Sequence, residues 1–88
     1  MRVRVKLFAT LIQSAPESLK ARYPQGIQPG FPLDVELPEG SSLADLVDQL
    51  ELPLPEVKVI FVNGRAQQSD YRLTPGDEIG IFPPIGGG

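Results

Sequence analysis

The sequence contains no cysteine, no histidine and no tryptophan among its 88 residues. Without cysteine, the chain can form neither a disulfide nor a thiolate metal site. Without histidine, it lacks the usual general base and the commonest metal ligand, and no Ser/His/Asp catalytic set can exist. The apolar runs are too short to span a bilayer, and no signal peptide opens the chain. We therefore expect a cytoplasmic protein with no bound metal and no membrane partner.

Positive charge is also scarce, because 8 Lys and Arg stand against 11 Asp and Glu, which gives a formal net charge of −3. This balance offers no basic footprint for nucleic acid, so we expect no nucleic-acid partner. It allows a weak electrostatic preference for a basic protein surface. The hydrophobic content of 41% argues against disorder, and a chain of this length supports one small domain.

Alternation of apolar and polar residues predicts two β-strands in the first half of the chain, residues 2–7 and 33–37. The alternation places Phe8 on the outer face of the first strand, together with the strand's cations. The alternative is that Phe8 turns inward where the strand ends. The positions expected in the core are Val3, Val5, Leu7, Leu33, Val35 and Leu37.

Two strands are also predicted in the second half. Residues 57–62 are dense in β-branched and aromatic side chains, which is typical of an interior strand. Asn63-Gly64 then suits a turn with positive φ, and residues 65–72 are polar and expected to cover one side of the domain. Residues 78–82 form the last predicted strand, with Ile79 and Ile81 inward and Phe82 outward.

The main helix is predicted after the second strand. Its apolar stripe has the spacing i, i+3, i+4, i+7, with Ser42 as N-cap, Asp45 at the third helical position and two prolines, Pro53 and Pro55, ending it. The stripe consists of Leu43, Leu46, Val47 and Leu50.

The segment between residues 11 and 32 carries weaker patterns. Ser14 followed by Glu17 has the form of a helix start, and an apolar residue recurs every fourth position from Leu11 to Tyr23. Residues 24–32 are rich in proline and glycine, so we expect an irregular loop anchored by Ile27 and Phe31.

The chain ends on Phe82-Pro83-Pro84-Ile85-Gly86-Gly87-Gly88, an unusual composition for a terminus. The prolines favour an extended chain leaving the domain. The glycines have no Cβ, so they can pass through a narrow slot. We therefore divide the chain into a domain of residues 1–82 and a flexible, extended C-terminal glycine tail of residues 83–88, with a carboxylate at Gly88 that can be activated chemically.

This ending resembles the C-terminus of the ubiquitin-like sulfur-carrier proteins, closest to the small subunit of molybdopterin synthase and next to the thiamin-biosynthesis sulfur carrier. The stretches Val62-Asn63-Gly64 and Leu73-Thr74-Pro75-Gly76-Asp77-Glu78-Ile79 agree with the family at the same spacing from the tail. The resemblance covers most of the chain and weakens between residues 11 and 32. Pattern alone leaves a ferredoxin-like sandwich open. The resemblance implies an α+β, β-grasp (ubiquitin-like) fold, a mixed sheet of four to five strands wrapped around one main helix.

The resemblance also implies a mechanism. A ubiquitin-activating-type enzyme would use ATP to adenylate the Gly88 carboxylate, which a sulfur donor would convert to a thiocarboxylate. The tail, with Gly86 and Gly87, would then enter the large subunit of molybdopterin synthase and deliver sulfur to the pterin precursor. Phe8, Ala66 and Phe82 would form the docking face for these partners; Ala66 stands where a larger apolar residue is common in the family, and the residues after Phe8 lack an arginine often found there.

The chain is not expected to be an enzyme by itself. Asp77 and Glu78 are adjacent carboxylates, but neighbours along a strand point to opposite faces. We expect no bound cofactor, since ATP belongs to the partner enzyme. The alternatives are a sulfur carrier for thiamin, tungstopterin, cysteine or tRNA thiolation, a ubiquitin-like protein modifier, or a purely structural interaction domain.

Overall fold

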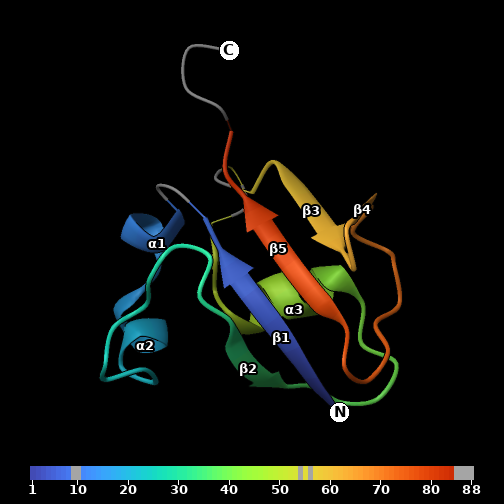
Figure 1. The fold of residues 1–88 in the computed structure, drawn as a ribbon, viewed down its shortest axis with the longest axis horizontal. Coiled ribbons are helices and arrows are strands. Elements are labelled where there is room, and N and C mark those ends of the chain that lie inside the picture. Colours follow the sequence, from blue (N-terminus) through green and yellow to red (C-terminus); the bar gives the residue numbers. More distant parts are fainter. Residues whose placement is uncertain (9–10, 54, 56, 85–88) are drawn as a thin grey trace.

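A five-stranded mixed sheet wraps over one helix (Figure 1). The computed structural model describes residues 1–8, 11–53, 55 and 57–84. The sheet order is β2-β1-β5-β3-β4, with β1 and β5 parallel at its centre and every other neighbouring pair antiparallel. The strands are β1 (Arg2–Leu7), β2 (Leu33–Glu36), β3 (Val59–Val62), β4 (Arg65–Gln67) and β5 (Glu78–Phe82).

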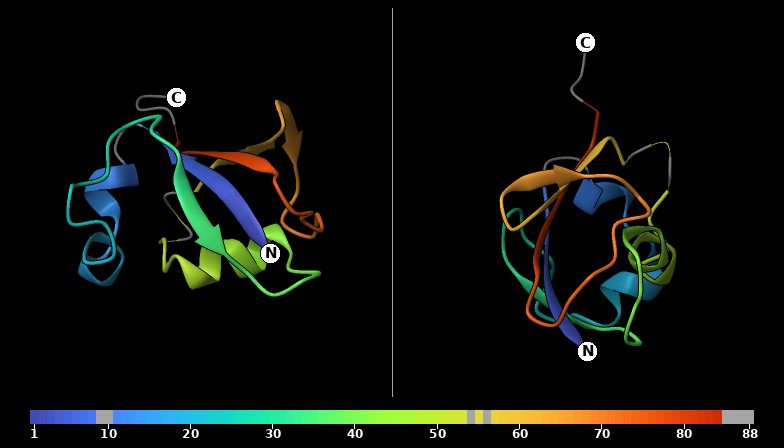
Figure 2. Two further views of the ribbon diagram at one scale, coloured as in Figure 1. Left: turned by 60° about the horizontal axis from the view of Figure 1, so that its bottom comes forward. Right: turned by 90° about the vertical axis from the view of Figure 1, so that its right-hand side faces the viewer.

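Helix α3 (Leu43–Gln49) lies against the inner face of the sheet, while two one-turn helices, α1 (Leu11–Ser14) and α2 (Glu17–Lys20), lie on the side away from β3 and β4 (Figures 1 and 2). Because α1 and α2 have four residues each, the described part of the chain has no second long helix, as a ferredoxin-like sandwich would need. The fold is therefore the β-grasp, ubiquitin-like arrangement, and this prediction is confirmed. Among the described residues, no helix is long and apolar enough to cross a membrane.

The core forms where the predicted apolar positions of the strands meet the stripe of α3. Each of the six inward positions predicted on the first two strands is at most 5% exposed, and so are the inward Ile79 and Ile81 of β5. Leu43, Leu46 and Leu50 are at most 1% exposed on the facing helix. The predicted registers of β1, β2 and β5 and of the helix are confirmed.

The start of α3 is stabilised as its sequence predicts. The Ser42 hydroxyl accepts a hydrogen bond from the Asp45 N–H at 3.2 Å, and the Asp45 carboxylate accepts one from the Ser42 N–H at 2.9 Å. This reciprocal capping box satisfies two N–H groups that the helix leaves free. The helix ends earlier than predicted, with Leu50 as C-cap and Glu51 in the left-handed region at φ 56°, ahead of Pro53.

The prediction that Ser14 caps the start of a short helix was wrong. Ser14 is the last residue of α1, and the N-cap of α2 is Pro16, which makes no side-chain hydrogen bond to the helix. Proline disfavours helical geometry in the residue before it, so Pro16 separates the two turns. The apolar edge itself is correct, because Leu11, Ala15 and Leu19 are at most 5% exposed.

Two further predictions in this half of the chain had different outcomes. Ile27 packs against the core as expected. Phe31 does not anchor the loop, because it is 63% exposed.

Strand β4 was missed. Asn63 and Gly64 have φ values of 51° and 85°, as the mirror-image turn of a two-residue hairpin requires. The turn aligns Phe61 with Ala66 across the β3–β4 pair. The polar residues 65–67 are thus an edge strand rather than a simple cover.

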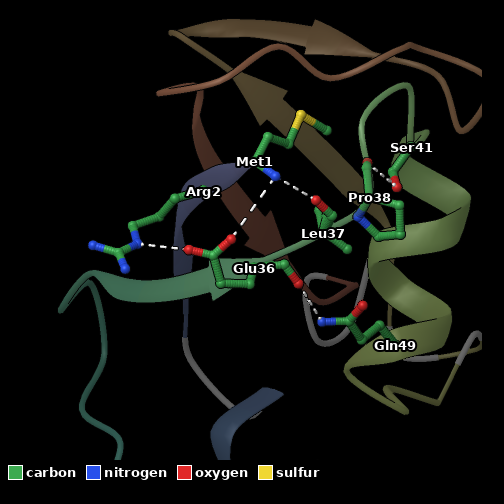
Figure 3. Close-up of polar contacts among 7 residues, drawn as sticks. All are labelled: Met1, Arg2, Glu36, Leu37, Pro38, Ser41 and Gln49. Atoms are coloured by element: carbon green, nitrogen blue, oxygen red, sulfur yellow. Dashed lines mark hydrogen bonds and ion pairs between the residues drawn. The ribbon is translucent and has the colours of Figure 1, made fainter.

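The end of the sheet where β1 begins is held by polar contacts (Figure 3). The amino nitrogen of Met1 donates to the Leu37 carbonyl at 2.6 Å and lies 3.8 Å from the Glu36 carboxylate. Arg2 pairs with the same carboxylate at 3.0 Å, and the Gln49 side chain donates to the Glu36 carbonyl at 2.8 Å. These contacts join the start of β1 to β2 and α3. They lie at the opposite end of the sheet from the C-terminal ends of β1 and β5.

Candidate functional site

A stacked pair of aromatic rings lies on the outer face of the sheet, where the two central strands end. Phe82 is the last residue of β5, and Phe8 directly follows β1. Because these strands are parallel, their C-terminal ends meet at one end of the molecule (Figure 1), and the Phe8 N–H donates to the Ile81 carbonyl at 3.2 Å. The ring centroids of Phe8 and Phe82 are 4.3 Å apart, with 3° between the ring planes. Phe8 therefore remains on the outer face and does not turn into the core.

A third aromatic ring, Phe61 of β3, meets this pair edge-on. Its centroid lies 5.6 Å from that of Phe82, with 83° between the planes. Both stacked and edge-to-face geometries are favourable for aromatic rings. We call Phe8, Phe61 and Phe82 the aromatic cluster.

Sequence reasoning missed Phe61 as a surface residue. Alternation could have found it, because Ile60 and Val62 on either side are buried and Phe61 must point the other way. Ala66 lies directly opposite Phe61 on β4, and it is exposed. Directly paired residues share a face of the sheet, so the structure brings Phe8, Ala66 and Phe82 onto one surface and adds Phe61 between them.

An open depression of about 380 Å³ lies within this surface. Its lining is mainly apolar, with Lys6, Asn63 and Glu78 as the residues that carry polar side chains. The remaining lining residues are Phe8, Phe61, Gly64, Ile79, Gly80 and Phe82.

Charges of both signs lie on the same face of the sheet as the aromatic cluster. Strand register sets Arg4 of β1 beside Glu78 of β5, and Asp34 of β2 lies on the other side of Arg4. An apolar centre with a polar rim is the usual composition of a protein-binding surface.

The adjacent carboxylates Asp77 and Glu78 point apart, as expected. Asp77 is 5% exposed, while Glu78 is exposed on the outer face. The Asp77 carboxylate accepts three hydrogen bonds of 2.9 Å, from the Asn63 amide, the Thr74 hydroxyl and the Thr74 N–H. Burial by itself raises the pKa of Asp77, but these three hydrogen bonds together outweigh it and hold the pKa below its usual value. Asp77 thus fixes the turn before β5.

Within the part of the chain that the structure describes, no group of three or more Asp, Glu, His or Cys side chains could hold a metal ion. The predicted tail residues Gly86, Gly87 and Gly88 lie outside the described residues, so their roles and the expected flexibility stay predictions. Pro83 is buried and Pro84 is exposed at the point where the description ends.

Comparison with known proteins gives the family. No curated protein sequence matches the chain. A putative molybdopterin converting factor, subunit 1, from Pyrococcus furiosus is 32% identical with a TM-score of 0.69, over 97% of this chain and 99% of that one. SAMP1 from Haloferax volcanii is 21% identical with a TM-score of 0.66 over the full length of both chains. A second H. volcanii structure, small archaeal modifier protein 1, is also 21% identical, with a TM-score of 0.65 over 96% and 98% of the two chains.

The two Haloferax structures support the fold, and the Pyrococcus structure extends the similarity to sequence. A sequence model of the ThiS family matches residues 27–88, which is well over half of the chain. The predicted resemblance to the ubiquitin-like sulfur carriers is confirmed, and the chain belongs to the ThiS family.

Proposed function

We propose that this protein carries sulfur as a thiocarboxylate on Gly88 and acts as the small subunit of a molybdopterin synthase. The observation that carries the proposal is the aromatic cluster, which lies where β5 ends and therefore beside the residues that lead into the tail. A partner that covers Phe8 and Phe82 is thus close to the start of the tail. The 32% identity to a putative molybdopterin converting factor subunit supports the choice of pathway.

The proposed chemistry begins at the Gly88 carboxylate, which is a poor electrophile because its negative charge repels attack. An oxygen of the carboxylate attacks the α-phosphorus of ATP, and pyrophosphate leaves. The resulting acyl adenylate is a mixed anhydride with AMP as its leaving group. A persulfide on a sulfur donor attacks the acyl carbon, AMP departs, and a second thiol then cleaves the S–S bond and releases the thiocarboxylate.

In this proposal, the protein itself supplies no catalytic side chain and binds no cofactor. A ubiquitin-activating-type adenylating enzyme binds the ATP, and the large subunit of the synthase later receives the thiocarboxylate and transfers its sulfur to the pterin precursor. The absence of side chains at Gly86 and Gly87 suits entry into both active sites. A cytoplasmic location is part of the proposal, because the chemistry consumes ATP.

The docking face has a separate task in this scheme. Phe8, Phe82 and Ala66, together with Phe61, would bind the partner surfaces and hold the tail near the reacting groups. Positioning of this kind converts an encounter in solution into an effectively intramolecular reaction. Docking and chemistry then depend on different residues and can be separated by mutation.

The proposal is tested by the intact mass of the protein after incubation with an adenylating enzyme of this type, ATP and a persulfide donor. We expect the mass gain of one oxygen exchanged for one sulfur, and no gain in a variant with an alanine added after Gly88. Isopeptide conjugates on lysine would instead show a protein modifier. If the wild type and the variant extended by alanine both bind the partner, and neither a thiocarboxylate nor an isopeptide conjugate forms, the protein is an interaction domain and the proposal is overturned.

A further inference from the structure

Gly80 lies in β5 directly beneath the aromatic cluster. Register sets it between Lys6 of β1 and Phe61 of β3 on the outer face of the sheet. A Cβ atom at this position would lie 3.3 Å from Cε2 of Phe8 and 3.4 Å from Cε1 of Phe82. These separations are below the roughly 3.5–4.0 Å at which carbon atoms attract best. A methyl group at this position would therefore require the Phe8 ring to shift by a few tenths of an ångström, and the larger side chain of valine would require a larger shift.

The opposite edge of the Phe8 ring rests on a second glycine. A Cβ atom at Gly30, in the loop before β2, would lie 3.3 Å from Cε1 of Phe8. The Gly30 N–H donates to the Leu7 carbonyl at 2.9 Å, which holds this loop beside the end of β1. Phe8 thus lies in a slot between Gly30 and Gly80, with one face against Phe82.

Backbone conformation does not explain the glycine at position 80. Gly30 has φ 72°, in the region that favours glycine, whereas Gly80 is in regular β5 and is not among the glycines with positive φ. Glycine in a strand interior costs stability relative to residues with a side chain, and it often marks a close approach of other groups. Here the approaching groups are the two rings of the stack.

We propose that Gly80 is a positioning residue for docking, because its missing side chain allows Phe8 and Phe82 to lie flat against each other in the geometry that the tail-activating enzyme binds. This inference rests on the proposed function, and it adds a residue that does not itself supply the contact. The partner binds the rings, and Gly80 sets where the rings lie. A side chain at this position would also fill the floor of the depression that the rings border.

The test uses the variants Gly80→Ala and Gly80→Val in the full chain. Because the backbone at Gly80 is ordinary strand, a side chain there reduces the entropy of the unfolded chain, which offsets the loss of the ring stack, and we expect an unfolding temperature near that of the wild type. We expect the KM for this protein in ATP–pyrophosphate exchange to rise, roughly tenfold or more for Gly80→Val, with kcat within about twofold because the Gly88 carboxylate is unchanged. The Gly80→Val and Phe82→Ala effects on KM should not add, since without the Phe82 ring the new side chain has less to displace.

Gly76→Ala is the matched control. Gly76 lies just before β5, at the end of the strand away from the stacked rings. It has φ 85°, and a Cβ there would have no neighbour within 4 Å. We expect this variant to lower the unfolding temperature and leave the KM unchanged, which is the reverse of the pattern at Gly80.

A readout in the isolated protein separates the inference from the proposed function. NMR contacts and ring-current shifts between Phe8 and Phe82 should be present in the wild type and lost or strongly changed in Gly80→Val. If the stack persists in Gly80→Val, or if the KM stays within about twofold of wild type, the positioning role is overturned. If the wild type supports no exchange at all, the proposed function and the docking role fail together, while the ring shifts still decide whether Gly80 sets the stack.

Discussion

Phe82 is the last residue of β5, the final strand in the part of the chain that the structure describes. Its neighbour Ile81 is fully buried, and Pro83, which follows it, is buried as well. Its own ring points to the other side of the sheet, where Phe8 and Phe61 are its contacts. A single residue thus joins the strand that completes the core to the surface that we assign to partner binding.

Phe82→Ala should weaken partner binding at least as much as it weakens folding. Aromatic pairs contribute about 0.5–1.5 kcal/mol beyond their buried area, so the loss of two such contacts should lower the free energy of unfolding by roughly 1–3 kcal/mol. Buried aromatic residues at interfaces commonly contribute about 2 kcal/mol or more to the free energy of binding. Loss of this contribution would lower the affinity by about thirtyfold or more. Thermal unfolding and titration with the adenylating enzyme measure the two effects.

Ile81→Ala is the control for the inner face of the same strand. Ile81 is 0% exposed, so its truncation should cost about 2–5 kcal/mol of unfolding free energy through lost transfer energy and a cavity. Binding per folded molecule should then stay near wild type. The docking assignment fails if Phe82→Ala behaves in the same way.

The Asp77 carboxylate should make stability depend on acidic pH. Its pKa is lowered in the folded protein, so its contribution is fully present above the unfolded pKa of about 3.9 and is lost as pH falls through the lower folded pKa. We expect Asp77→Asn to lose roughly 1–3 kcal/mol at neutral pH, because the new amide cannot accept all three hydrogen bonds. The difference from wild type should shrink below about pH 4, as measured by urea unfolding over a pH series.

Asp45 provides the comparison for this pH series. Its pKa is also lowered, by the backbone and side-chain hydrogen bonds of Ser42, but its carboxylate is exposed at the start of α3. An Asp45→Asn variant should therefore keep most of the acid dependence of the wild type. Equal slopes for wild type and Asp77→Asn would contradict the role given to Asp77.

At the scale of elements, the predictions succeeded where one period dominated the sequence. The strict alternation of β1 and the stripe of α3 each admit one buried face, so register followed directly from the residues. β4 has three residues and no apolar alternation, since it is an edge strand specified by the Asn63-Gly64 turn and by pairing with β3. Pairing is a tertiary property, which a local pattern does not carry.

The prediction for the segment of α1 and α2 failed for a related reason. Spacing by four residues predicted the correct buried edge, but the effect of Pro16 on the residue before it was not weighed against that spacing. Phe31 shows the same limit, because hydrophobicity alone predicted an anchor, whereas the turn at Gly30 leaves the side chain 63% exposed.

Leu46→Ala tests the packing of α3. Leu46 is 0% exposed at the centre of the stripe, so its truncation should cost about 2–5 kcal/mol. In a domain of this size, that is a large share of a total stability of roughly 5–15 kcal/mol. Asp48→Ala on the exposed side of the same helix is the control and should change the free energy of unfolding by no more than about 0.5 kcal/mol. Denaturant unfolding measures both, and equal losses would show that the stripe does not carry the packing of α3.

At the scale of the whole molecule, polar contacts hold one end of the sheet, and the other end carries the aromatic cluster that we propose for docking. Figure 3 shows the contacts of Met1, Glu36 and Gln49 at the first, while the aromatic cluster lies at the second. The outward positions of Phe8 and Phe82 were readable from alternation. Phe61 and Gly80 were not proposed for the docking face, because their proximity to the stack depends on the order of β1, β5 and β3 in the sheet.

Deletion of Gly88 should separate docking from chemistry across the whole molecule. The aromatic cluster is unchanged by this deletion, so affinity for the adenylating enzyme should stay within about threefold of wild type, which is less than 1 kcal/mol. Exchange of pyrophosphate into ATP should nevertheless be lost, because the shortened tail no longer brings its carboxylate to the α-phosphorus, and a misplacement of even about 1 Å can cost a hundredfold in rate. Phe82→Ala should show the opposite pattern, with weak binding but near-normal turnover at saturating protein. Exchange at the wild-type rate after deletion would show that the reacting carboxylate is not positioned through Gly88, and it would remove the chemical basis of the proposed function.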